Sequence, residues 1–136
     1  LCDWSSDVCS SDLTARVHFN AHAERAGRFG KRIVYGGHVI SVARALSFAG
    51  LENAWFVSAI NGGRHVAPCF AGDTVYAWSK VISKVPVHGL PWGALRIQTI
   101  ATKDRNCDDY PFKTAAGTYD PAVILDLDYW VMMPRR

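Results

Sequence analysis

The sequence predicts an α+β fold in which one apolar helix packs against an antiparallel sheet. Residues 38–49 are apolar on nearly every side of a helix, and the later segments alternate between apolar and polar residues. Because no helix separates these segments, an antiparallel sheet is the simplest way to join them. The chain has 136 residues and is 49% hydrophobic, so it is the size of one domain with a core. This composition excludes disordered, collagen-like and coiled-coil proteins, and no apolar run approaches the roughly 20 residues of a membrane helix.

We expect the main helix to cover Gly37–Ala49 and to be nearly fully buried, because few of its positions are polar. Its apolar residues are Val39, Ile40, Val42, Ala43, Ala45, Leu46 and Phe48. Gly50 then ends it. A shorter helix is expected at Ala21–Arg28, with Asn20 as its N-cap and Gly30 at its end.

Four later segments have the alternation of strands, namely Ala54–Ile60, Thr74–Val85, Ala94–Thr102 and Val123–Met133. Asn61–Gly63 is predicted to be a turn, and residues 86–92 and 103–121 are predicted to be loops. Asp126 and Asp128 share one strand face, where we interpret them as exposed carboxylates on a sheet edge. One buried helix wrapped by a curved antiparallel sheet is the hotdog arrangement.

Residues 1–13 do not fit the rest of the chain. They are rich in Ser and Asp, contain no Lys or Arg, and run DWSSDVCSSDL from Asp3, which looks like a translated sequencing adapter. We therefore place one domain at 14–136 and exclude this tail from the fold. Without its three aspartates, 15 basic side chains face 9 acidic ones, a net charge of +6. The remaining Cys69 and Cys107 lack metal-ligand spacing and fit a reducing, cytoplasmic setting.

The positive charge does not indicate a nucleic-acid or membrane partner, because it is scattered along the chain. Its one cluster consists of Arg25, Arg28, Lys31 and Arg32. Aromatic residues do not alternate with these bases as they do in a stacking platform for nucleic acid. A phosphate-bearing small molecule needs only a few such charges, and this is the kind of ligand that we expect.

Two runs resemble the MaoC-like, (R)-specific enoyl-CoA hydratases. The first, HFNAHAERAGRFGKRIVYGGHVISVARAL, is similar to the region that holds the family's catalytic His and the Gly that opens its hotdog helix. His18 matches that His and Gly36 that Gly. The second, HVAPCFAGDTV (His65–Val75), is similar to the family's Pro-x-x-x-Gly-Asp entry into a strand. The family's Asp would fall at position 13, where this sequence has Leu13.

A narrower resemblance covers Thr14–Arg136. The runs RFGKRIVYGGHVIS, INGGRHVAPCFAGDTVYAWS and LDLDYWVMMPR are similar to the C-terminal half of double-hotdog hydratases that act on mesaconyl-CoA. The resemblance implies a truncated half of a hydro-lyase that adds water reversibly to an α,β-unsaturated acyl-CoA. It also implies a CoA thioester substrate, a second hotdog domain or homodimer partner, and neither metal nor cofactor.

Hydration of an unsaturated thioester requires a base for water, an acid for C2 and donors for the enolate-like oxygen. The resemblance gives His18 the acid–base role. Gly36 begins a helix, where backbone amides are unpaired and the dipole is positive, so it is the candidate oxyanion site. The Gly37 amide and His38 are its neighbours there. A buried core histidine and a plain loop glycine are the structural alternatives for His18 and Gly36.

Three further residues are candidates for substrate binding. Asn20 follows His18 closely, although helix capping is its simpler role. A substrate carboxylate would need a cationic partner, for which Arg32 and Arg64 are the candidates.

Two other functions remain open. One is a hotdog thioesterase, which the lack of a carboxylate in residues 38–49 disfavours. The other is a non-catalytic half that supports a partner domain, which the presence of His18 and Gly36 disfavours.

Overall fold

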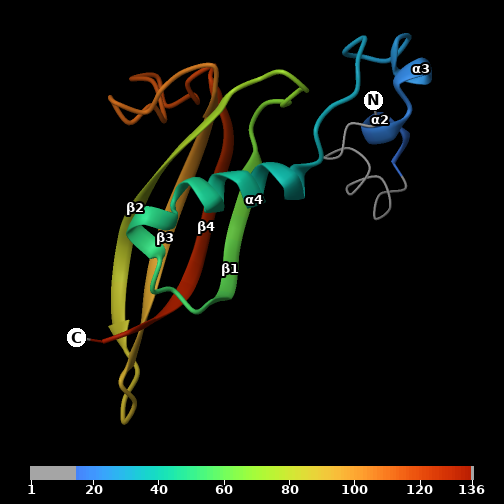
Figure 1. Cartoon of the computed structure of the whole chain (residues 1–136). Helices are drawn as coiled ribbons and strands as arrows, with labels where there is room; N and C mark the ends of the chain where they lie inside the picture. The colour runs from blue at the N-terminus through green and yellow to red at the C-terminus, as the bar shows by residue number, and fades with distance from the viewer. Residues whose placement is uncertain (1–14, 136) are drawn as a thin grey trace.

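The computed structural model describes residues 15–135. The predicted tail at 1–13, which includes Leu13 at the position of the family's Asp, lies outside the described residues, as does Thr14. Within residues 15–135, four helices come first and four strands follow (Figure 1). The helices are α2 (Arg16–Phe19), α3 (Ala21–Glu24), α4 (Gly36–Leu46) and α5 (Phe48–Leu51). The strands are β1 (Phe56–His65), β2 (Val75–Pro86), β3 (Trp92–Lys103) and β4 (Val123–Pro134).

The strands form one antiparallel sheet, as predicted, and their order in it is β1-β4-β3-β2. The predicted turn at Asn61–Gly63 is wrong, because these residues continue β1, with Gly62 opposite Asp128 and Gly63 opposite Leu127. The register shifts between Ile60 and Gly62, as in a β-bulge, and the strand continues past this shift through both glycines. A Cβ on Gly63 would lie 2.9 Å from Leu127 Cδ1, so glycine here permits close packing rather than a turn.

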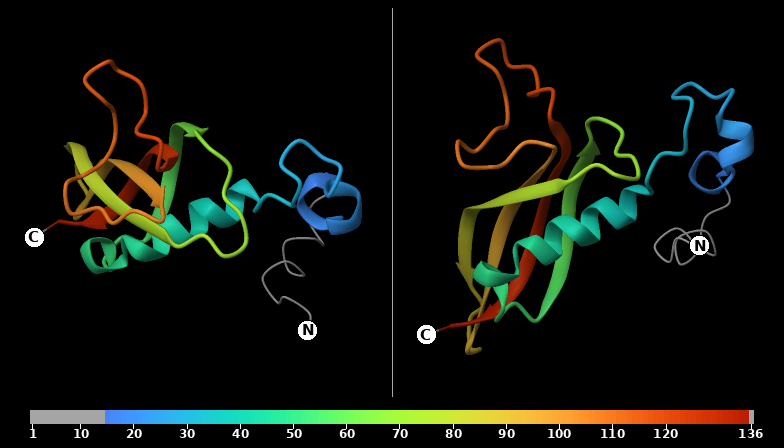
Figure 2. Two further views of the ribbon diagram at one scale, coloured as in Figure 1. Left: turned by 90° about the horizontal axis from the view of Figure 1, so that it is seen from above. Right: turned by 45° about the horizontal axis from the view of Figure 1, so that its top comes forward.

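Helix α4 crosses one face of the sheet obliquely, as both views of Figure 2 show. Val39 and Ala43 are its buried residues. They belong to a cluster with Ile97, Leu125, Leu127, Tyr129 and Val131 on the sheet. Burial of this apolar surface is the main force that holds the helix on the sheet.

The prediction of a nearly fully buried helix over Gly37–Ala49 is wrong. Helix α4 ends at Leu46, and α5 begins after Ser47, whose Oγ donates to the Ala43 carbonyl. Leu46 is 51% exposed and Phe48 is 67% exposed. The physical reason is that a four-stranded sheet reaches only one side of a helix, so its opposite side stays uncovered. Within residues 15–135, no helix has the length and apolarity needed to span a membrane.

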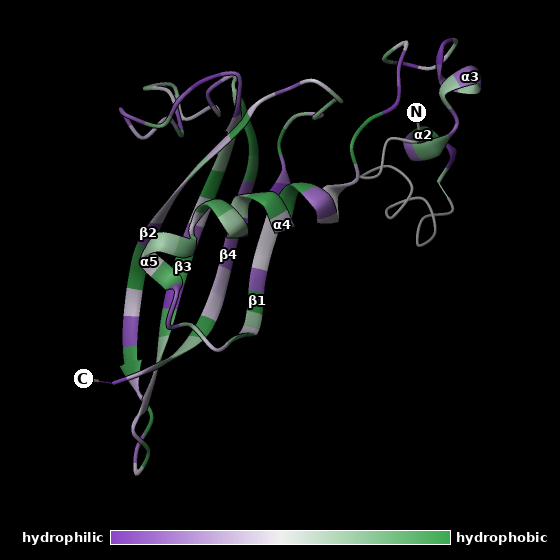
Figure 3. Cartoon of the chain, in the orientation of Figure 1, coloured by the Kyte–Doolittle hydropathy of each residue, from purple (hydrophilic) through white to green (hydrophobic). Residues whose placement is uncertain are grey.

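Strand β1 is an edge strand and is exposed along its whole length. Its exposed apolar side chains include Phe56, Val57 and Ile60. Figure 3 shows apolar positions on both β1 and α4. The described chain therefore has an open sheet edge beside a half-covered helix.

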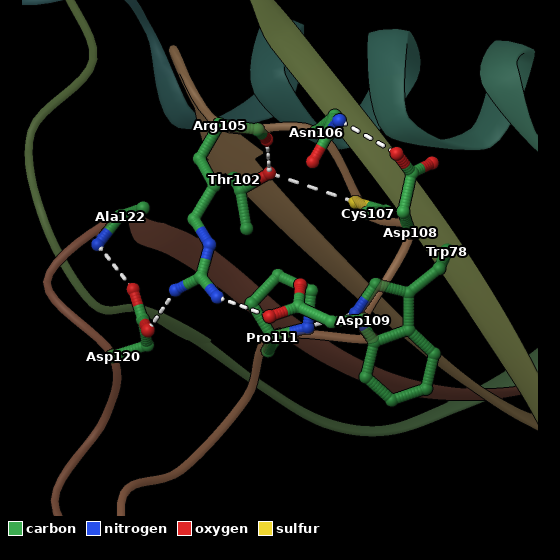
Figure 4. Close-up of polar contacts among 10 residues, drawn as sticks. All are labelled: Trp78, Thr102, Arg105, Asn106, Cys107, Asp108, Asp109, Pro111, Asp120 and Ala122. Atoms are coloured by element: carbon green, nitrogen blue, oxygen red, sulfur yellow. Dashed lines mark hydrogen bonds and ion pairs between the residues drawn. The ribbon is translucent and has the colours of Figure 1, made fainter.

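The loop between β3 and β4 is held by side-chain contacts. Trp78 Nε1 donates to the Pro111 carbonyl at 3.1 Å, and the Trp78 ring meets Phe112 edge to face. Arg105 bonds to both Asp120 and Asp109, while Thr102 Oγ1 donates to the Arg105 carbonyl at 2.6 Å (Figure 4). The loop is thus fixed to the sheet by an aromatic cluster and an arginine clamp.

The clamp predicts a pH dependence of stability. The Ala122 amide and then Arg105 lower the pKa of Asp120 below its ordinary value. This contribution is present above the unfolded pKa and is lost as pH falls through the lower folded pKa. We expect the free energy of unfolding in urea to fall between about pH 5 and pH 2 by more in the parent chain than in Asp120→Asn. Asp108→Asn, on the same loop, is the matched control and should behave like the parent; equal slopes for all three chains would contradict the clamp.

Candidate functional site

His18 lies on α2 and is half-buried. Its Nδ1 is 3.0 Å from the Ile33 carbonyl oxygen, and its ring meets Tyr35 edge to face at 5.8 Å between centroids. A carbonyl can only accept, so Nδ1 carries the hydrogen in this bond. In the neutral imidazole, Nε2 is then unprotonated and can accept a proton. The fold thereby selects the tautomer that a general base needs.

Asn20 caps α3, since its Oδ1 accepts from the Ala23 amide at 2.9 Å. The predicted helix over Ala21–Arg28 is too long, because α3 ends at Glu24. Glu24 is buried and pairs with Arg16 Nε at 3.2 Å, which holds α3 against α2. The chain then leaves the helix through Gly27 and through Gly30, whose φ is +67°. Asn20 therefore positions the segment after His18.

The segment that carries His18 is tethered to the loop before β2. The Val34 amide donates to the Cys69 carbonyl at 2.7 Å. Phe29 meets Phe70 edge to face, and Lys31 Nζ lies 4.1 Å from the centroid of the Phe70 ring. Figures 1 and 2 show α2 and α3 beyond the N-terminal end of α4, away from the sheet.

Gly36 is the first residue of α4, and the imidazole of His65 lies directly against it. A Cβ on Gly36 would be 2.5 Å from His65 Nε2. The sequence predicted Gly36 as the candidate oxyanion site and assigned no role to His65. The only available signal was the position of His65 at the start of the second matched run. Contact across α4 and β1 depends on the folded sheet, so spacing alone could not reveal it.

The first turn of α4 has amide donors to offer. The amides of His38 and Val39 donate to the Tyr35 carbonyl at 3.0 and 3.2 Å. The amides of Gly36 and Gly37 precede them, at positions that have no acceptor within the helix itself. An anionic oxygen at this end would gain from both donors and from the helix dipole. His38 is half-buried beside them.

Gly36 has two candidate roles, as the oxyanion site and as the small residue against which the His65 imidazole packs, and the two roles make separable predictions. In a full-length hydratase of the kind that the resemblance implies, Gly36→Ala keeps the backbone N–H, but its methyl group would hold the thioester oxygen away from that donor, so turnover should fall by about 100-fold, as it does when an oxyanion donor is lost. It should also reduce stability, because the new methyl group displaces His65. The double variant Gly36→Ala with His65→Ala should recover the melting temperature but not turnover. Recovery of both would mean that His65 alone requires the glycine.

The candidate arginines lie in different places. Arg32 is half-buried, and its Nη1 donates to the Phe19 carbonyl at 3.4 Å, close to α2. Arg64 lies next to His65 on β1 and therefore points to the other face of the sheet. Its guanidinium is 5.9 Å from the centroid of the Tyr119 ring. The structure thus brings Gly36, Gly37 and His65 together at one end of α4, while Arg64 is outside this group.

Arg64 helps to line a shallow polar cavity of about 290 Å³. Asp126 and Asp128 line it too, and both are half-buried on the inner strand β4, so the prediction of exposed edge carboxylates is wrong. Arg96 Nε donates to Asp128 at 3.0 Å and, with Asn61, lowers the pKa of that carboxyl. Asp126 accepts from Gln98 and from Tyr119. These carboxylates are already engaged in bonds within the sheet.

Cys69 and Cys107 are free cysteines, and burial raises the pKa of each thiol. A raised pKa reduces the thiolate fraction at neutral pH. Neither side chain is therefore suited to nucleophilic catalysis.

Comparison with known proteins reveals close relatives. The chain is 64% identical over 124 residues to a β-methylmalyl-CoA dehydratase from Chloroflexus aurantiacus, which covers 90% of this chain and 35% of that protein. It is 49% identical over 122 residues to a mesaconyl-CoA hydratase from Cereibacter sphaeroides, which covers 90% of this chain and 34% of that protein. The chain thus spans about a third of the length of these relatives. No family model matches the sequence.

Solved structures agree with this similarity. A MaoC domain protein dehydratase from Chloroflexus aurantiacus superposes with a TM-score of 0.86 at 64% identity, covering 90% of this chain and 35% of that one. A Mycobacterium tuberculosis protein described as having a double hotdog fold superposes with a TM-score of 0.63 at 23% identity, covering 96% and 35%. The chain thus has the hotdog fold, is similar to a MaoC domain protein dehydratase, and is a close homologue of β-methylmalyl-CoA dehydratase and mesaconyl-CoA hydratase over about a third of their length.

Proposed function

We propose that the chain is part of a hydro-lyase that adds water reversibly to mesaconyl-CoA and forms β-methylmalyl-CoA. The observation that carries this proposal is the 64% identity to a β-methylmalyl-CoA dehydratase over 124 residues. Two features support it. His18 on α2 has an Nε2 that can accept a proton, and the amides of Gly36 and Gly37 at the start of α4 can donate to an oxyanion. An acid–base group and oxyanion donors are what hydration requires.

The proposed reaction uses these groups in two steps. His18 Nε2 takes a proton from water as the water oxygen bonds to C3. The electron pair of the C2–C3 double bond moves through C2 to the thioester oxygen. The amides of Gly36 and Gly37 stabilise the negative charge that develops there. The protonated His18 then gives this proton to C2 as the thioester carbonyl re-forms, so one water molecule has been added across the double bond and His18 is neutral again.

The activity belongs, in this proposal, to the longer protein rather than to the chain by itself. The carboxylate that would orient the histidine falls at position 13, outside the described residues, where the sequence has Leu13. The relatives, which are about three times as long as the matched segment, indicate that further chain is needed.

The test is an assay of the purified full-length protein with mesaconyl-CoA. Hydration would consume the conjugated double bond without release of free CoA thiol. A thioesterase would instead release the thiol. Helix α4 (Gly36–Leu46) contains no Asp or Glu to assist thioester cleavage, which favours hydration. Thiol release that keeps pace with substrate loss would overturn the proposal.

We also propose that a second hotdog domain covers the open side of this one. Strand β1 is an unpaired edge, and Ile60 on it is 63% exposed. Leu46 and Phe48 leave a further apolar area at the other end of α4, beside β2, where Ser47 Oγ lies 2.9 Å from Ser79 Oγ. In the full-length protein, the amides of β1 should exchange hydrogen as slowly as those of β4. Rapid exchange along β1 alone would contradict a docked second domain.

A further inference from the structure

Arg44 is a cation on α4 that the reaction described above does not use. Its side chain is half-buried, and its guanidinium carbon lies 5.2 Å from the centroid of the Tyr129 ring. Its Nη1 is shielded from solvent and has no hydrogen-bond partner among residues 15–135. Arginine keeps its charge in proteins, so this nitrogen cannot become neutral to avoid the cost. A buried donor without an acceptor is unfavourable, which indicates that something else supplies one.

The hydroxyl groups near Arg44 form a chain between the sheet and the helix. Tyr129 Oη is 3.1 Å from Thr99 Oγ1, which is 2.8 Å from Ser79 Oγ. Ser79 Oγ is 2.9 Å from Ser47 Oγ, and Ser47 Oγ is 3.0 Å from the Ala43 carbonyl oxygen. Because that carbonyl can only accept, Ser47 must donate to it, and every other hydroxyl then donates toward Ser47. The chain is neutral and cannot provide a negative charge for Arg44.

Protein carboxylates do not fill this need within the described residues. Helix α4 contains no acidic residue, and Asp126 and Asp128 lie on the other face of β4 from Tyr129. Both are bonded there, Asp128 to Arg96 and Asp126 to Gln98 and Tyr119. Within the described residues the charge of Arg44 is thus unmatched, and a ligand that brings its own anion would match it.

The geometry points to Arg44 as the residue that binds the far carboxylate of a dicarboxylic acyl thioester. This inference rests on the proposed function and names the group that distinguishes mesaconyl-CoA from a simple enoyl-CoA. The planar guanidinium offers two parallel donors that match a carboxylate. Arg32 already donates to the Phe19 carbonyl, and Arg64 is on the other face of the sheet, so neither is placed as Arg44 is.

The position of Arg44 agrees with a thioester at the start of α4. Eight residues separate Gly36 from Arg44, a rise of about 12 Å along the helix axis. Side chains on a helix generally slope toward its N-terminus, which favours a guanidinium directed back toward Gly36. The acyl group would therefore run along α4, with its thioester oxygen at Gly36 and Gly37 and its carboxylate toward Arg44.

Binding of two saturated thioesters to the full-length protein tests this assignment without relying on turnover. Methylsuccinyl-CoA carries the carboxylate and butyryl-CoA lacks it. We expect Arg44→Met to weaken binding of methylsuccinyl-CoA by about 30- to 150-fold, the range for losing a charge-assisted pair, and to leave butyryl-CoA binding unchanged. Arg44→Lys should recover part of the preference, because it keeps the charge but not the fork.

Arg96→Met is the matched control, since Arg96 is already paired with Asp128 on the other face. It should leave the ratio of the two affinities unchanged. An unchanged ratio in Arg44→Met, with the variant still binding butyryl-CoA, would overturn the assignment. Failure of the proposed function would give a different result. The parent would not hydrate mesaconyl-CoA, yet the ratio of its affinities for methylsuccinyl-CoA and butyryl-CoA would still depend on Arg44.

Discussion

Replacing His18 with alanine should reduce the turnover of the full-length enzyme by about 100-fold or more, the usual scale for a general acid–base group. The Nδ1 bond to the Ile33 carbonyl leaves Nε2 as the only proton-accepting atom of the neutral ring. Alanine removes that atom and leaves no nearby replacement on α2. The measurement is kcat for hydration of mesaconyl-CoA, with circular dichroism to establish that the fold survives.

His22→Ala is the matched control. His22 is exposed on α3, four residues farther along the chain, and should be replaceable without loss of turnover. If His18→Ala hydrates mesaconyl-CoA at the parent rate, His18 has no part in the mechanism.

Replacing Ile97 with alanine should lower the free energy of unfolding by about 2–5 kcal/mol. Ile97 is 1% exposed and belongs to the cluster that joins α4 to the sheet. Alanine would leave a cavity in this cluster, next to Tyr129 on the neighbouring strand. Urea denaturation of the purified chain measures the change, which is large relative to a total stability of about 5–15 kcal/mol.

Ile82 offers the comparison, because it is an isoleucine of the same sheet that is 45% exposed. Ile82→Ala should cost no more than about 1 kcal/mol. Similar losses at both positions would show that the cluster around Ile97 is not the core of the domain.

The strands were predictable because their alternation survives in the sequence. Val123–Met133 alternates cleanly, and β4 covers Val123–Pro134. The prediction of a turn at Asn61–Gly63 failed because it used only the local residue types, whereas pairing with a strand far away in the sequence determined the conformation. Two glycines after Asn61 normally indicate a turn, but pairing with Asp128 and Leu127 keeps them extended. Burial of α4 was overestimated for a related reason. The apolar residues of a helix indicate that its surface is covered in the functional protein, but not whether the same chain or another part of the protein covers it.

The candidate site divides in the same way. His18 and Gly36 were found through motif similarity, and the cap at Asn20 followed from local chemistry. The contact of His65 with Gly36 and the unpartnered nitrogen of Arg44 could not be found this way. Both depend on how strands that are far apart in sequence face one helix. Arg44 in particular is one of few polar positions in an apolar segment, and its meaning appears only with the surroundings of its guanidinium.

The strand order β1-β4-β3-β2 has a consequence for how the domain forms on the ribosome. Strand β1 is synthesised first among the strands, but its partner β4 is synthesised last. Phe56 therefore cannot pair with Met132 until the end of the chain has been made. The β2–β3 hairpin can form meanwhile, whereas β1 remains an apolar segment with both edges unsatisfied. Such non-local pairing slows folding and prolongs exposure to aggregation. The nascent chain therefore spends its most vulnerable period between the emergence of β1 and that of β4, when a chaperone that shields short apolar strands would raise the yield of folded protein.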